Sequence, residues 1–225
     1  MKKILFFAAA MVSALSTYAQ DCDVFIPLKK GTEMVYSYYN KPGVLESTAK
    51  TIITETSNLP GGVKVRLNTE VFDKESKSKM NYDYDMWCEN GVFYIDMMNM
   101  LSTMDVKDPK GFQIESNNMQ FPSKMYPGQT LGDASLSMKM GTGFVSMGIT
   151  VNITNRKVES IDNITTPAGT FECYKITYDT SSKILMMKIQ TKVTEWYAKN
   201  VGLVRSESFD KKGKLTNIAE LTSLK

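Results

Sequence analysis

Apolar and polar residues alternate in short runs along most of this chain. In the run from residue 63 to 72, Val63, Val65 and Leu67 occupy every second position, and polar residues stand between them. A period of two places such apolar side chains on one face of a β-strand. Because similar runs recur from residue 34 to the C-terminal end, the pattern predicts many short strands and hardly any helix.

Turn-forming residues separate the runs and predict tight hairpins. Asn90-Gly91 stands between MNYDYDMWC and VFYIDMM, and Asn-Gly supplies the positive φ angles of a type I′ turn. Pro167-Ala168-Gly169 predicts a second turn. The segment 199–202 predicts a third, in which Gly202 is free to adopt a positive φ. Links this short cannot form parallel crossovers, so the strands should run antiparallel.

Two segments depart from the alternation. One has the i, i+3, i+4, i+7 spacing of a helix and predicts a single short helix; its apolar residues are Met97, Met100, Leu101 and Met104. The other, residues 117–134, is rich in proline and glycine and predicts a long loop.

The complete pattern predicts an all-β fold. We expect an antiparallel meander of about ten to twelve strands, with at most one short helix. A sheet of this size should curl into a half-barrel or barrel, or split into a two-layer sandwich. No change in composition marks a domain boundary, so we expect a single β domain over residues 21–225.

Residues 1–20 have the pattern of a cleaved signal peptide. A basic MKK precedes the apolar run ILFFAAAMVSALS, and Thr17-Tyr18-Ala19 matches a small-x-small cleavage site. Gln20 and Asp21 stand before Cys22 where a lipoprotein signal needs small residues, so lipidation is not favoured. No later segment approaches ~18 consecutive apolar residues, so we expect no membrane span. The expected location is periplasmic or secreted.

Charge and cysteine content narrow the classes of partner and site. The formal net charge is +3, of which Lys2 and Lys3 in the leader contribute two. No block of basic residues could follow a phosphate backbone, so we expect no nucleic-acid partner. Export would allow one disulfide among Cys22, Cys88 and Cys173, with the pairing open. The remaining cysteine would be a small buried apolar residue or a reactive thiol.

The chain contains no histidine, and this excludes whole classes of catalysis. Ser-His-Asp and Cys-His nucleophile systems, imidazole bases and histidine zinc sites all need that side chain. Neither a Walker loop nor a dinucleotide-binding glycine motif is present. We therefore expect no metal and no cofactor.

Carboxylates are the remaining candidates for chemistry. Asp83 and Asp85 share a strand face with Trp87, roughly 6–7 Å apart by strand rise. Such a pair is compatible with glycosidase-type acid/base work, and a solvated polar face is the simpler interpretation. Asp105 and Asp108 could contribute oxygen ligands to calcium.

Methionine is abundant, with sixteen residues in the chain. This flexible side chain fills irregular cores and also lines adaptable apolar binding surfaces. Curled sheets with apolar interiors can hold one hydrophobic ligand. The ligand-binding candidates are Met97, Met100, Leu101, Met104 and Trp196.

Trp196 lies in the stretch TEWYAKNVGLVRSES. Alternation there places Val193, Glu195 and Tyr197 on one face of a strand and Trp196 on the other. Trp196 is therefore either a core anchor or one wall of a cavity.

Three longer stretches carry a resemblance to a known family. FIPLKKGTEMVYSYYNKPGVLESTAK, TPAGTFECYKI and EWYAKNVGLVRSES resemble, in order and spacing, the secreted domain-of-unknown-function 3108-like family. The resemblance implies an exported, mainly antiparallel β protein from a Gram-negative bacterium. It implies no particular activity and carries over no catalytic residues.

These observations lead to three functional hypotheses. The first is an exported non-enzymatic β domain that binds a lipid or other hydrophobic small molecule in an apolar cavity. The second is a structural or interaction protein that holds a partner in the cell envelope. The third is a carboxylate-based hydrolase.

Overall fold

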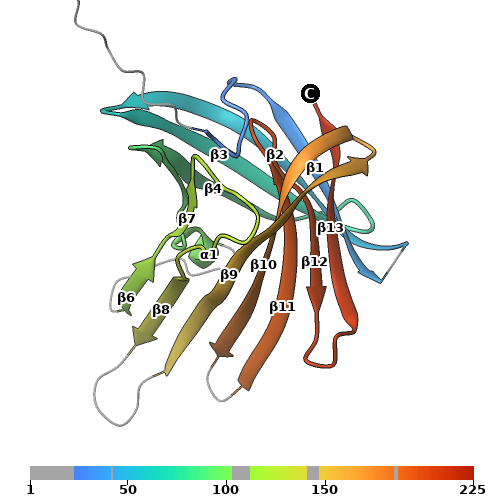
Figure 1. Cartoon of the computed structure of the whole chain (residues 1–225). Coiled ribbons are helices and arrows are strands. Elements are labelled where there is room, and N and C mark those ends of the chain that lie inside the picture. The colour runs from blue at the N-terminus through green and yellow to red at the C-terminus, as the bar shows by residue number, and fades with distance from the viewer. Residues whose placement is uncertain (1–22, 42, 103–111, 141–146, 185–186) are drawn as a thin grey trace, which may run out of the picture.

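In the computed structural model, thirteen strands form one antiparallel sheet that curls into a nearly closed barrel (Figure 1). The structure describes residues 23–41, 43–102, 112–140, 147–184 and 187–225. The all-β prediction is confirmed, with slightly more strands than expected. The expected signal peptide, residues 1–20, lies outside the described residues.

The first half of the sheet contains β1 (Glu33–Lys41), β2 (Val44–Leu59), β3 (Gly62–Asp73), β4 (Ser78–Glu89), β5 (Val92–Ile95), β6 (Phe112–Asn117) and β7 (Met119–Pro122). The second half contains β8 (Ala134–Met140), β9 (Met147–Thr166), β10 (Gly169–Ile184), β11 (Met187–Ala198), β12 (Gly202–Phe209) and β13 (Leu215–Leu224).

The strand order places the first and last strands side by side and leaves a seam elsewhere in the barrel. The order is β6-β8-β9-β10-β11-β12-β13-β1-β2-β3-β4-β5-β7, so β1 pairs with β13 in the middle of the sheet. Figure 1 shows β1–β4, in blue to teal, crossing over β8–β13, in yellow to red. At the seam, β7 contacts β8 without a strand ladder between them.

The predicted hairpin turns are confirmed. Asn90 and Gly91 have φ angles of 52° and 75°, as a type I′ turn requires. Gly169 has a φ of 139° between β9 and β10. Asn200 and Gly202 have φ angles of 58° and 103° between β11 and β12.

Of the two segments that depart from the strand alternation, one matches its prediction and the other does not. The predicted loop over 117–134 is wrong in part, because residues 119–122 form β7 and pair with β5. Met119 and Phe121 alternate with Gln120, and the apolar pair is buried. Pro122 is compatible with this strand because β7 is an edge of the sheet and needs no further partner. The predicted short helix is confirmed as α1 (Asn99–Ser102), a single turn.

The main core fills the inside of the barrel. Val24, Phe25 and Ile26, which precede β1, are buried in it. The Phe25 ring packs against Phe93 and Phe121 at centroid distances of 5.9 and 5.5 Å. This N-terminal segment therefore acts as a plug between the two halves of the sheet. Within the described residues, no helix is both long and apolar enough to cross a membrane.

Candidate functional site

A pocket of about 260 Å³ enters the barrel between β1–β4 and the β11–β12 hairpin. We call it the tyrosine pocket, after Tyr36, Tyr38, Tyr82 and Tyr84. Met34, Met86 and Ala49 supply apolar lining, and Phe25 and Tyr197 close the inner side. The wall is therefore mostly apolar, with a few polar groups, which is typical of a small-molecule site.

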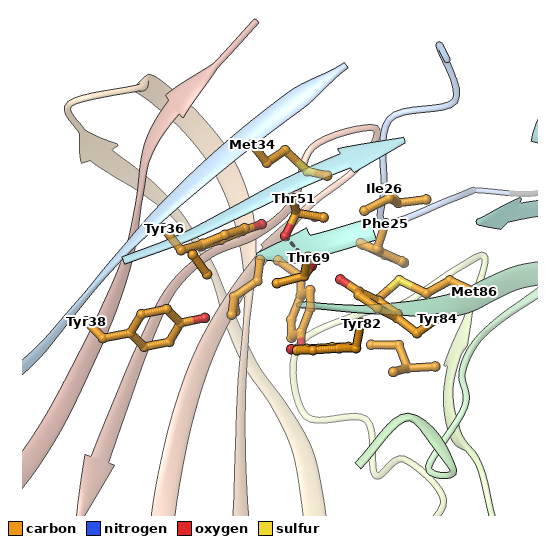
Figure 2. Close-up of a pocket in the computed structure, with 15 residues that line it drawn as sticks. Phe25, Ile26, Met34, Tyr36, Tyr38, Thr51, Thr69, Tyr82, Tyr84 and Met86 are labelled. Atoms are coloured by element: carbon orange, nitrogen blue, oxygen red, sulfur yellow. Dashed lines mark hydrogen bonds between the residues drawn. The ribbon is translucent and has the colours of Figure 1, made fainter. Parts of the chain in front are cut away.

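The alternation of β1 and β4 positions the tyrosines. Tyr82 and Tyr84 occupy alternate positions of β4, so both side chains lie on the face that lines the pocket inside the barrel. Figure 2 shows four hydroxyls directed toward the middle of the pocket, those of Tyr36, Tyr38, Tyr82 and Tyr84. The rings of Tyr82 and Tyr84 lie 5.8 Å apart.

These hydroxyls are neutral near pH 7. Burial raises the pKa of Tyr84 to about 12 and raises the pKa of Tyr36 further. Beside them, the Thr51 and Thr69 hydroxyls form a 2.7 Å hydrogen bond between β2 and β3 (Figure 2). The pocket therefore offers uncharged hydrogen-bond donors and acceptors on an apolar wall.

A buried carboxyl lies behind the inner wall. Glu195 on β11 is 9% exposed and points to the same side of the sheet as Tyr197. Burial raises the pKa of Glu195, and hydrogen bonds from the Tyr178 and Tyr197 hydroxyls partly offset that rise. Glu195 Oε2 has no hydrogen-bond partner. Tyr197 thus borders the tyrosine pocket with its ring and meets Glu195 with its hydroxyl.

A β-bulge on β9 turns an arginine toward this carboxyl. Val151 and Ile153 point inward, and strict alternation would place Asn155 inward next. Instead Asn155 is exposed with a φ of 57°, and the pairing of β9 with β10 shifts there. The extra residue changes the phase, so Arg156 points inward and is only 1% exposed.

Arg156 ties the barrel together across its seam. Its Nη1 donates to the carbonyl oxygens of Gln120 on β7, at 3.0 Å, and Gly132 before β8, at 2.8 Å. Its guanidinium carbon lies 5.0 Å from the centroid of the Phe121 ring. Nε and Nη2 have no hydrogen-bond partner. Burial lowers the pKa of Arg156, and electrostatic interaction with the nearby Tyr197 and Glu195 opposes that effect.

We call Arg156, Tyr178, Glu195 and Tyr197 the interior polar cluster. The sequence predicted no functional role for any of its members. Glu195 carried a detectable signal, because it shares a strand face with the apolar Val193 and the aromatic Tyr197. Arg156 carried none, since the bulge hides its direction from the alternation pattern.

The sequence-predicted ligand-binding residues lie elsewhere. Met97 and Leu101 are buried in the main core, and Met100 packs against it. Met104 lies outside the described residues. Trp196 lies on the opposite face of the sheet, in a small cluster with Cys173, Ala198 and Val204. The structure thus brings three of the candidates together and separates Trp196 from them. None of these four described candidates lines the tyrosine pocket.

Trp196 is held by polar contacts at the edge of its cluster. Its Nε1 donates to Asp162 Oδ2 at 3.1 Å, and Lys175 Nζ lies 5.6 Å from the ring centroid. With 8% exposure, the indole is buried among apolar neighbours. These contacts are those of a side chain that packs the outer side of the β10–β12 sheet.

The cysteine predictions resolve in part. Cys88 is disulfide-bonded, and Cys173 is free and buried. Burial raises the pKa of the Cys173 thiol to about 12. Cys22 lies outside the described residues.

The predicted carboxylate pair lies on the outer face of β4. Asp85 accepts hydrogen bonds from Arg66 and is 2.8 Å from Lys64 Nζ, and Asp83 accepts from Asn68. The Arg66 guanidinium holds the pKa of Asp85 below its usual value. An ionised, ion-paired carboxylate is a poor general acid.

Asp105 and Asp108 lie outside the described residues. Among the residues that the structure describes, no group of three or more His, Cys, Asp or Glu side chains could hold a metal ion.

Comparisons with known proteins agree with this architecture. The chain is 28% identical to a lipoprotein candidate from Parabacteroides distasonis ATCC 8503, over 92% of this chain and 100% of that chain, with a TM-score of 0.74. It shares the fold of an exported-protein candidate with a YmcC-like fold from Bacteroides fragilis NCTC 9343, at 22% identity and a TM-score of 0.74. That match covers 91% of this chain and 100% of the other.

No curated protein matches the chain. The model of the DUF3108-like family matches residues 29–221, which is most of the chain. This protein therefore belongs to the DUF3108-like family.

Proposed function

We propose that this protein is an exported, non-enzymatic β-barrel that binds one small hydrophobic or amphipathic ligand in the tyrosine pocket. The observation that carries the proposal is the pocket itself, an apolar hollow with tyrosine hydroxyls directed into it. The lipoprotein and exported-protein candidates with the same fold support an envelope location, periplasmic or secreted.

The size of the pocket limits the ligand. At about 260 Å³ it lies just below the roughly 300–1,000 Å³ of typical ligand pockets. One short apolar chain fits such a space better than a lipid with several tails. The neutral hydroxyls directed into the pocket would hydrogen-bond a polar group of the ligand without requiring a charged one.

Native mass spectrometry of protein purified from its own envelope tests the proposal. We expect a retained small molecule, and we expect Ala49→Leu, which narrows the pocket, to abolish its retention. Thr48→Leu is the matched control, because Thr48 directly precedes Ala49 in β2 and its side chain lies on the other face of the strand, away from the pocket. If no small molecule is retained and 1-decanol fails to raise the melting temperature, the proposal is wrong.

A second candidate function, an interaction protein of the envelope, has one observation in its favour. Met187 and Ile189 at the start of β11 are 65% and 53% exposed. Exposed apolar side chains close together can mark a protein contact. If a protein partner co-purifies with wild type and is lost from the double variant Met187→Ser, Ile189→Ser, this function is supported over ligand binding.

A further inference from the structure

The interior polar cluster contains an arginine edge that has no hydrogen-bond partner. On an arginine, Nε and Nη2 form one edge that matches the two oxygens of a carboxylate. Arg66 uses this edge on the outer face, where Nε and Nη2 donate to the Asp85 oxygens at 3.0 and 3.2 Å. The same edge of Arg156 is buried and has no hydrogen-bond partner. Buried donors are nearly always paired, so an acceptor is expected there.

A second unpartnered atom lies in the same cluster. Glu195 Oε2 is buried without a hydrogen bond, while the Tyr178 and Tyr197 hydroxyls interact with the same carboxyl. Arg156 and Glu195 influence each other electrostatically, yet no ion pair joins these two residues. A group between them could accept from the arginine and share a proton with the carboxyl.

We propose that the ligand is a monocarboxylate with an apolar chain, whose carboxylate is bound by the Nε–Nη2 edge of Arg156 and whose chain occupies the tyrosine pocket. The inference rests on the proposed function and adds the chemical class of the ligand. Glu195, in its protonated form, donates to the same carboxylate through Oε2.

Tyr197 connects the two regions. Its ring lines the tyrosine pocket, and its hydroxyl meets Glu195 inside the barrel. The proposal requires this one side chain to rotate, so that the ligand chain in the pocket can reach Arg156. The Phe121 ring, 4.9 Å from the Tyr197 ring and 5.0 Å from the guanidinium carbon, supplies an apolar floor beside the headgroup.

Charge balance selects a singly charged headgroup. One arginine neutralises one negative charge, and a dianionic phosphate would leave excess charge in a buried site. Ionised Glu195 would repel any anion. The charged and titratable groups that face Glu195 from the surrounding strands are Arg156, Tyr178, Tyr197 and Tyr38. The tyrosines remain neutral near pH 7, so Glu195 is the group whose ionisation would weaken carboxylate binding as the pH rises.

Calorimetric titration with decanoate and 1-decanol tests the headgroup. The two probes have the same chain, and only decanoate can engage the arginine edge. We expect decanoate to bind wild type at least tenfold more tightly than 1-decanol does. Arg156→Lys keeps the charge and removes the planar edge, so it should weaken decanoate at least tenfold and leave 1-decanol unchanged. Far-UV circular dichroism confirms that the variant is folded.

Glu195→Gln provides a test that survives if the arginine variant fails to fold. Above the pKa of Glu195, we expect decanoate affinity of wild type to fall by up to tenfold per pH unit. Glutamine does not titrate, so the variant should keep one affinity over the whole pH range in which the affinity of wild type falls. A wild-type profile that is as flat as that of Glu195→Gln would overturn the role of Glu195.

The remaining outcomes distinguish failure of the carboxylate assignment from failure of the proposed ligand-binding function. Equal binding of decanoate and 1-decanol, unaffected by Arg156→Lys, overturns the carboxylate assignment and leaves the pocket intact. Tighter binding of decyl phosphate than of decanoate overturns the carboxylate in favour of a phosphate. If neither decanoate nor 1-decanol binds, the proposed function fails together with this inference.

Discussion

The N-terminal plug offers the sharpest test of how this barrel is held together. Phe25 is 2% exposed, and its ring contacts those of Phe93, Phe121, Tyr174 and Tyr197 at centroid distances of 5.5–6.4 Å. These partners come from β5, β7, β10 and β11, so one side chain joins both halves of the sheet. Phe25→Ala would remove this link and leave a cavity.

Burial and ring contacts set the size of the effect. Phe→Ala in a core costs about 3–5 kcal/mol of unfolding free energy, from lost transfer energy and the cavity. Phe25 also borders the open tyrosine pocket, so part of the new space can fill with water, and we expect about 3–4 kcal/mol. For a domain of this size, each kcal/mol lowers the melting temperature by about 2–4 °C, which gives a decrease of roughly 6–16 °C.

Urea unfolding followed by circular dichroism measures the free energy directly. Leu28→Ala, in the same segment at 38% exposure, is the matched control and should change stability by less than about 1 kcal/mol. A loss below about 1 kcal/mol for Phe25→Ala would refute the plug. If the ligand chain lies in the tyrosine pocket, the same variant should also accept a longer chain than wild type.

Three further predictions each test a single feature of the fold. Cys173 should not react with Ellman's reagent at pH 8 until the protein unfolds, because a thiol with a pKa of about 12 is ionised in only about one molecule in ten thousand. The Arg66 guanidinium lowers the pKa of Asp85, so this ion pair stabilises the fold above about pH 3.9, and the stabilisation is lost as the pH falls further. In urea unfolding, Asp85→Asn should therefore lower the free energy of unfolding by at most about 1 kcal/mol at pH 7, and by less at pH 3. Gly62→Ala should lower the free energy of unfolding by about 2–3 kcal/mol or more in the same assay, because the new Cβ would lie 1.8 Å from a carbonyl oxygen of the facing strand. In the control Gly132→Ala, the new Cβ meets no atom within 4 Å, so the free energy of unfolding should change by no more than about 0.5 kcal/mol.

Local pattern was enough to predict most of the strands and their faces. The solvated face predicted for Asp83 and Asp85 is the outer face of β4, and the alternation around Glu195 separated that residue correctly from Trp196. These predictions hold because a strand side chain has only two directions, and a neighbour of known polarity decides between them.

The candidate site depends on contacts between distant strands and on a β-bulge, and the local sequence pattern reveals neither. Tyr36 and Tyr84 approach each other because the sheet curls across β2 and β3, which is a property of the whole barrel. Arg156 points inward because of one extra residue at Asn155, and such a bulge reverses every expectation that follows it. Met97, which precedes α1, and Leu101 within α1 are buried in the main core, and Met100 packs against it; the helical spacing describes a buried face without saying what covers it.

Arg156 contacts both the seam of the barrel and the polar groups in its interior. Its Nη1 holds the carbonyl oxygens of Gln120 and Gly132 across the seam, while Nε and Nη2 remain free inside. A buried arginine whose donors are only partly satisfied contributes little to stability, because its desolvation penalty offsets its attractive contacts. The arginine that closes the seam needs only the Nη1 contacts for that purpose. Its orientation toward Glu195, produced by a dedicated bulge, is therefore better explained by a bound acceptor, and a ligand on that edge would stabilise the closed seam by mass action.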